Sequence, residues 1–291
     1  MKVVELNKLC MKFKQKLVLK NITLNLEEGN IYGLVGKNGA GKTTMMKIIL
    51  GLLPGYKGEV RLFESTELEK QRRKIGALIE TPVFYESMTG YENLNYYRIA
   101  NGLKNTKEID ELLKLVKLED AGNRKYKTYS LGMKQRLGIA YAMLGDPEFL
   151  VLDEPINGID PEGIVEIRNL FKSLAKNGKT ILISSHLLNE LEQLSDDIFI
   201  IENGELIDEI ITSKKEESKF HTMIVTDNDK KFEEILKELG LSKNDRNEID
   251  GVFDINTIVK KIYSNNLNIL ELERRKNNLE EYYIDQLERR N

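Results

Sequence analysis

Residues 36–43, Gly-Lys-Asn-Gly-Ala-Gly-Lys-Thr, constrain this chain more than any other part of its sequence. They match the pattern G-x-x-x-x-G-K-[ST], in which glycines let the backbone come close to phosphate groups. An apolar run typical of a buried strand, 31–35, precedes them, and a run typical of a helix, 43–50, follows. A glycine-rich turn at a helix N-terminus presents backbone N–H groups at the positive end of the helix dipole. The sequence therefore predicts a site for the β- and γ-phosphates of a nucleotide.

Length and composition limit the other possibilities. The 291 residues are enough for about two domains, and 41% hydrophobic residues allow a sizeable core. A net charge of −3 gives no general reason to expect nucleic-acid binding, and the single cysteine, Cys10, excludes an intrachain disulfide. No apolar run approaches the length of a membrane span, and residues 1–5 lack the apolar core of a signal peptide. We therefore expect a cytoplasmic protein.

The order of strand and helix patterns predicts an α/β core that a helical insertion interrupts. Strand patterns dominate to residue 79, helical patterns replace them over about 83–145, and strands and helices alternate again from 149 to 206. A polar stretch at 213–219 suggests a boundary, so we expect one domain over 1–212 and another over 213–291.

The second predicted domain is small and of α+β type. Strand patterns occur at 221–226, 251–255 and 267–272. Helical patterns occur at 232–239, from 255 to 262, and at 279–287.

Two carboxylates follow a hydrophobic run at 149–152. A buried strand there would deliver Asp153 to the phosphate site, where it can hold Mg²⁺, and Glu154 suits a general base for an attacking water. The alternative is an exposed strand end with two solvated acids. Further upstream, Ser130 is predicted to cap a helix whose Ser-Leu-Gly N-terminus would be a second anion site.

Together these motifs resemble the ATP-binding subunits of ABC transporters over about residues 1–212. The phosphate loop, the signature Ser-Leu-Gly-Met-Lys-Gln-Arg at 130–136, Leu-Val-Leu-Asp-Glu-Pro at 150–155, Asn-Gly-Ile-Asp-Pro at 157–161 and His186 occur in that family's order. The resemblance implies a P-loop ATPase core with an antiparallel β subdomain and a helical insertion, and ATP and Mg²⁺ as ligands.

The resemblance also implies individual roles. Glu154 and His186 would be catalytic, and Thr43, Asp153 and Glu80 would lie at the metal. ATP would contact Phe13, Gly36, Asn38, Gly39, Ala40, Gly41, Lys42, Thr43 and Thr44. For Phe13 the alternative is an aromatic residue of the core, and for His186 it is a histidine that caps a helix.

The family works as a head-to-tail dimer in which two helix N-termini converge on one triphosphate. The resemblance therefore places Ser130, Gly132 and Gln135 on the ATP of a second subunit, identical or related, and Asp160 at the dimer interface. ATP would hold the two subunits together, and hydrolysis with phosphate release would open them.

Some positions depart from the usual family pattern. Leu131 and Met133 stand where Gly and Gln are usual, Glu80 where Gln is usual, and Ile156 where Thr or Ser is usual. Glu80, the signature and the extra C-terminal domain resemble the bacitracin-resistance and lantibiotic-immunity ATPases. These pair with separate multispan permeases and export peptide antibiotics.

Two functions are therefore compared. The first is an exporter subunit at the inner face of the membrane, in which segment 81–92 with Phe84, Tyr85 and Tyr91 receives a coupling helix of the permease; the alternative for these rings is core packing. The second is a soluble ABC ATPase that acts as a clamp on ribosomes or DNA. For the C-terminal domain, binding of a regulator, strengthening of the dimer and a structural role are all left open.

Overall fold

The computed structural model describes residues 1–80, 84–186, 188–211, 220–243, 248–250 and 253–276. The chain forms two compact units, Met1–Ile211 and Thr212–Asn291, and each is described here by itself.

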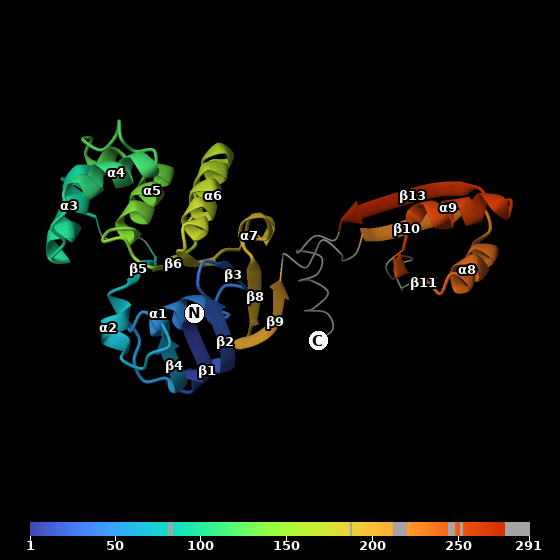
Figure 1. Cartoon of the computed structure of the whole chain (residues 1–291), viewed down its shortest axis with the longest axis horizontal. Helices are drawn as coiled ribbons and strands as arrows, with labels where there is room; N and C mark the ends of the chain where they lie inside the picture. Colours follow the sequence, from blue (N-terminus) through green and yellow to red (C-terminus); the bar gives the residue numbers. More distant parts are fainter. Residues whose placement is uncertain (81–83, 187, 212–219, 244–247, 251–252, 277–291) are drawn as a thin grey trace. The chain divides into compact units, whose positions relative to one another are not determined.

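The larger unit is built on a six-stranded sheet with the order β5-β6-β7-β3-β8-β9 (Figure 1). Neighbours from β5 to β8 are parallel, and β9 runs antiparallel to β8. The strands are β3 (Ile31–Val35), β5 (Ile75–Leu78), β6 (Phe149–Asp153), β7 (Thr180–Ser184), β8 (Asp197–Glu202) and β9 (Glu205–Ile211). The sheet order makes β6, β7 and β3 neighbours, so their carboxyl ends meet at one edge.

A second, antiparallel sheet has the order β2-β1-β4, which confirms the predicted β subdomain. Its strands are β1 (Lys2–Phe13), β2 (Lys16–Glu27) and β4 (Lys57–Leu62). Alternate residues such as Leu6, Ile22 and Leu62 are buried in one apolar cluster with Met45 of helix α1 (Lys42–Ile49) and Phe149 of β6. The shared core fixes the phosphate loop between the two sheets.

Helices separate β5 from β6, as the helical pattern predicts. They are α3 (Gly90–Ala100), α4 (Lys107–Leu115), the 3₁₀ helix η1 (Tyr126–Thr128) and α5 (Leu131–Ala142). Thr89 begins α3 with a capping box, because its hydroxyl accepts from Glu92 N–H while the Glu92 carboxylate accepts from Thr89 N–H. The apolar side chains at 109, 112 and 113 bury one face of α4.

Arg136 ties α5 to its neighbours. Its guanidinium donates to Val116 O at the end of α4 and to Glu166 Oε2, 2.8 Å away on α6 (Pro161–Lys176). The hydrogen bond from Arg136 lowers the pKa of the Glu166 carboxyl below its usual value. The other helices in the described part of this unit are α2 (Leu68–Arg72) and α7 (Leu188–Leu194). In the described part of the chain, no helix combines the length and apolar character of a membrane span.

The smaller unit contains its own apolar core. Strand β10 (Phe220–Thr226) pairs antiparallel with β13 (Ile269–Lys276), and the short strands β11 (Ser242–Lys243) and β12 (Ile249–Asp250) form a second pair. Helices α8 (Asp229–Glu238) and α9 (Ile255–Ser264) bury Phe232, Leu236, Ile258 and Ile262 together with Ile224 of β10.

The predicted strand at 251–255 is wrong over its described part. Asp254 caps α9 by accepting from Asn256 N–H, and Ile255 is already helical. A side-chain cap outweighed the short apolar pattern, since the Asp oxygen satisfies a helix N–H that would otherwise have no partner. Residues 251–252 and the predicted helix at 279–287 lie outside the described residues.

The separate core of the smaller unit leads to a stability prediction. Phe232→Ala removes a fully buried ring and should destabilise this unit by about 3–5 kcal/mol. Calorimetry should show one lowered transition and a second transition, from the larger unit, that is unchanged. Tyr263→Ala is the control, because that side chain is 59% exposed and its loss should change stability by less than about 0.5 kcal/mol. Equal shifts of all transitions in the Phe232 variant would contradict independent cores.

Candidate nucleotide site

The phosphate loop leads directly from β3 into α1. Gly41 adopts φ +114°, a conformation that residues with a Cβ rarely adopt, and a Cβ there would lie 2.6 Å from Leu19 Cδ2. At Gly36 a Cβ would lie 2.1 Å from Ile201 O, so the backbone is packed where a side chain has no room. The glycines therefore serve close packing as well as the turn.

Lys42 points its ammonium back into this loop. The side chain is buried, and Nζ donates to Gly36 O at 2.6 Å and to Lys37 O at 3.4 Å. Both acceptors are neutral carbonyls, so a buried positive charge lies in the loop with no anion beside it among these contacts. This environment fits a phosphate group.

Asp153 lies at the carboxyl end of β6, where two hydroxyls bind its carboxylate. Thr43 Oγ1 donates to Oδ2 at 2.7 Å, and Ser184 Oγ at the end of β7 donates to Oδ1. A hydroxyl and one carboxylate beside a phosphate loop suit Mg²⁺, which takes few protein ligands and keeps phosphate and water oxygens. The described residues contain no cluster of three or more His, Cys, Asp or Glu side chains that would suit a metal held by protein alone.

Glu154 is held by contacts on both its backbone and its side chain. Its φ of +51° is left-handed, and strained backbone of this kind is concentrated at functional sites. Glu154 N–H donates to Ser184 Oγ at 3.0 Å, and its carbonyl accepts from Gln135 Nε2 at 3.0 Å. The Glu154 carboxylate lies 2.7 Å from His186 Nδ1. Contacts of the Glu154 backbone and of a carboxylate oxygen therefore fix the orientation of this side chain.

A cavity of about 370 Å³ brings most of the predicted residues together. Phe13 lies at its wall and is 43% exposed, so the alternative of a core aromatic does not hold. The predicted residues that line the cavity are Phe13, Asn38, Gly39, Gly41, Lys42, Thr43, Thr44, Asp153 and Glu154. Gly36 and Ala40 are buried in the loop behind it, and His186 reaches the site through Glu154.

The signature residues do not line this cavity. Ser130 caps α5 by accepting from Met133 N–H, as its sequence position predicts. Gly132 lies against Gly158, where a Cβ would be 3.4 Å from Gly158 O. Asp160 precedes α6 as its N-cap residue. Gln135, in contrast, contacts the backbone of Glu154 in its own chain.

Glu80 also lies away from the cavity. Its carboxylate pairs with Lys47 of α1 at 2.7 Å, and its φ is +60°. Glu80 lines a different cavity of about 530 Å³, together with Tyr97 and Tyr141 of the helical insertion. The structure therefore places this carboxylate between α1 and the insertion.

The three aromatic residues expected at a permease groove differ in exposure, and Tyr91 is half-buried. Phe84 is buried, with its ring centroid 5.1 Å from that of Tyr126, so core packing describes it. Tyr85 is 44% exposed, and its ring meets Tyr96 edge to face.

With this geometry established, comparison with known proteins decides the family. A family model described as ABC transporter matches residues 19–157. The bacitracin transport ATP-binding protein BcrA of Enterococcus faecalis is 39% identical over 294 residues, which cover 97% of this chain and 95% of that protein. The chain belongs to the ATP-binding subunits of ABC transporters. It therefore binds ATP and is an ATPase.

Other similar proteins support the same family assignment. A lantibiotic transport ATP-binding protein of Streptococcus pyogenes is 42% identical over 196 residues, 67% of this chain and 85% of that protein. A solved ATP-binding subunit of an ABC transporter superposes with a TM-score of 0.66 at 30% identity, covering 73% of this chain and 91% of that one. A dimeric ATP-binding cassette with ADP and phosphate bound superposes equally well at 29% identity, covering 72% and 98%.

Sequence reasoning missed two polar contacts, one inside the nucleotide site of this ABC ATPase and one outside its cavity. Ser184 binds both Asp153 and the Glu154 backbone, and Lys47 takes up the Glu80 carboxylate. Ser184 follows the apolar run at 181–183, which is typical of a buried strand, so its place beside the other strand ends could have been predicted from the sequence. Lys47 carried no such signal, because a lysine on a helix surface is usually solvated.

The contacts of Ser184 lead to a test. Ser184→Ala removes the hydroxyl that donates to the Asp153 carboxylate and one of the two acceptors of Glu154 N–H, which also donates to Ser184 O at 3.2 Å. The loss of a hydrogen bond to a charged group costs about 1.5–3 kcal/mol. We expect kcat for ATP hydrolysis to fall about tenfold or more while the affinity for ATP changes little, because Lys42 and the loop are untouched. Ser173→Ala, at an exposed position of α6, is the matched control. Unchanged kcat would show that Ser184 does not hold the carboxylates in place.

Proposed function

We propose that this chain hydrolyses ATP to energise the export of peptide antibiotics through a separate, multispan membrane permease. The chain would be held at the inner face of the membrane by that permease. The observation that carries the ATPase chemistry is the placement of Glu154 between Ser184 and His186 beside the phosphate loop. The choice of cargo is supported by the relatives named for bacitracin and lantibiotic transport.

The chemistry divides among the residues of the site. Lys42 and the loop N–H groups bind the β- and γ-phosphates, and Phe13 stacks on the adenine. Thr43 and Asp153 would hold Mg²⁺, which would neutralise phosphate charge. Glu154 accepts a proton from the attacking water, while His186, in contact with the Glu154 carboxylate, holds it toward the phosphate.

A second subunit completes the site. Ser130 and Gly132 stand at the N-terminus of α5 and not in their own chain's cavity, which suits a head-to-tail dimer. The α5 N-terminus would then face the phosphates bound to the partner, and Asp160 would lie at the contact between the subunits. Residues 1–212 would form this ATPase domain, with the insertion over about 83–145, and residues 213–291 a separate domain.

The permease contact is assigned to the insertion. Tyr85 is exposed there, and Glu80 lines the neighbouring cavity and pairs with Lys47 of α1. Force from a permease segment in this region would therefore reach the phosphate-loop helix through one ion pair. Nucleic acid is not expected as a partner, given a net charge of −3.

Substitution of the general base tests the chemistry. Glu154→Gln keeps the shape but removes the proton acceptor, so ATP turnover should fall by about 10²–10⁴-fold. Because ATP stays intact, the variant should accumulate as a dimer in sedimentation runs with Mg²⁺-ATP and remain a monomer without it. Glu162→Gln, an exposed glutamate in the first turn of α6, is the control. Normal turnover in the Glu154 variant would remove Glu154 from its assigned role.

Co-purification tests the transporter assignment. The full chain, isolated in mild detergent from its native membranes, should bring with it a stoichiometric multispan protein. Tyr85→Ala should reduce this recovery while basal ATPase activity stays normal, whereas Tyr263→Ala, also at an exposed tyrosine, should leave it unchanged. Recovery of ribosomal or DNA-bound partners alone would instead favour a soluble ATP-driven clamp.

A further inference from the structure

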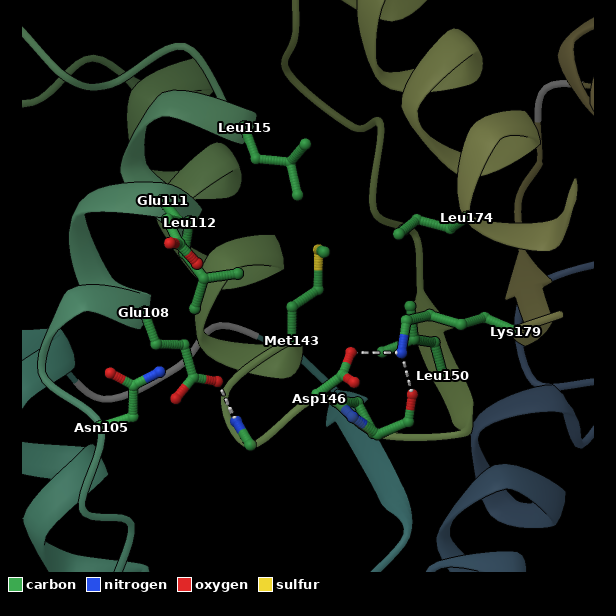
Figure 2. Close-up of a pocket in the computed structure, with 12 residues that line it drawn as sticks. Asn105, Glu108, Glu111, Leu112, Leu115, Met143, Asp146, Leu150, Leu174 and Lys179 are labelled. Atoms are coloured by element: carbon green, nitrogen blue, oxygen red, sulfur yellow. Dashed lines mark hydrogen bonds and ion pairs between the residues drawn. The ribbon is translucent and has the colours of Figure 1, made fainter. Parts of the chain in front are cut away.

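A separate cavity of about 600 Å³ lies between α4 and α6 (Figure 2). Two elements that contribute to the nucleotide site, α5 and β6, also reach this cavity at the ends that lie away from that site. Helix α5 starts at the signature and ends beside Met143, which lines the cavity, while β6 passes Leu150 in the cavity before it reaches Asp153. We name this hollow the α4–α6 cavity.

The floor of the α4–α6 cavity is apolar. It is formed by Leu112 and Leu115 of α4, Met143 after α5, Leu150 of β6 and Leu174 of α6. Four of these side chains are buried, while Leu115 is 43% exposed at the opening. A leucine held at the edge of an apolar floor favours an occupant with an apolar side, because covering it removes apolar surface from water.

The rim of the cavity is acidic. Glu108, Glu111 and Asp146 contribute three carboxylates, against one amine from Lys179. That amine is already engaged, since Lys179 Nζ lies 2.6 Å from Asp146 Oδ1 and 2.7 Å from Pro147 O (Figure 2).

The other two carboxylates differ in their contacts. Glu108 accepts from Gly145 N–H, and Glu111 has no hydrogen-bond or ion-pair partner among the described residues. The uncompensated charge at the opening is therefore negative, and it lies next to the exposed Leu115.

We propose that the α4–α6 cavity binds a basic amphipathic helix of a partner protein. An apolar face of that helix would cover Leu115 and the floor, and its Lys or Arg side chains would reach Glu111 and Glu108. A trough between two helices with apolar floor and charged rim is the setting in which a third amphipathic helix is recognised. The charge complementarity excludes an acidic partner, which the rim would repel.

A helix bound in this cavity would contact several elements of the larger unit. The floor brings together α4 of the insertion, β6 of the sheet and helix α6, so a bound helix would hold these parts together. The inference concerns a surface outside the nucleotide cavity and does not rest on the proposed export function.

A designed peptide tests this site directly. The probe is a peptide of about 14 residues, roughly four helical turns, with Leu on one face, Lys on the other and a single Trp on the Leu face. The chain contains no Trp, so the peptide is the only indole in the mixture and its emission reports burial. The full-length chain without nucleotide should bind the peptide and shift that emission to shorter wavelength.

Matched variants locate the binding. Leu115→Ser and Glu111→Lys should each weaken the peptide affinity by about tenfold, the loss expected for one apolar contact or one charge pair. Val165→Ser on α6 and Glu119→Lys beyond α4 change exposed residues outside the cavity and should have no effect. All four positions are exposed, and unchanged thermal unfolding will establish that the variants are folded.

Three results would overturn the proposal. They are no binding of the peptide to the wild-type chain, equal affinity for the two cavity variants and the wild type, and equal binding of a peptide in which Glu replaces every Lys. The last result would show that apolar contact alone, and not the acidic rim, selects the occupant.

Discussion

The Asp153 carboxylate holds the nucleotide site together because it accepts from two hydroxyls on different elements. Thr43 lies in the first turn of the helix after the phosphate loop, and Ser184 ends the strand beside β6. These contacts require β6, β7 and β3 to be neighbours, which the order of the parallel sheet provides. Ser184 also binds the backbone of Glu154, so the loop, the carboxylate proposed to bind the metal and the proposed base are positioned by one short network.

The insertion is joined to this network by polar contacts at both ends. Just before the insertion, Glu80 pairs with Lys47 of the phosphate-loop helix. Near its end, Gln135 donates to the Glu154 carbonyl, and Arg136 joins α5 to α4 and α6. A movement of the insertion would therefore shift the residues around Glu154. Because coupling between two sites acts in both directions, a change at the nucleotide site would also shift the insertion.

Sequence reasoning succeeded where function depends on a contiguous motif. The strand, glycine turn and helix around Lys42, and the buried strand that ends at Asp153, follow from local rules that tertiary contacts here reinforce. It was less successful in the smaller unit, where short apolar patterns and caps compete, and a strand was predicted where Asp254 starts a helix. Sequence reasoning also could not predict side-chain pairs such as Glu80 with Lys47, because residues 33 positions apart share no local pattern.

The sequence by itself determined the phosphate loop, the carboxylates after β6, the capped signature helix and the order of strands and helices. These features depend on residues close together in the chain, whose spacing and backbone preferences decide them. Tertiary structure alone decided that Ser184 would hold Asp153, that Glu80 would face α1, and that an acidic, apolar-floored cavity would open between α4 and α6. Each of these depends on which strands and helices become neighbours, and that is set by burial of the whole core.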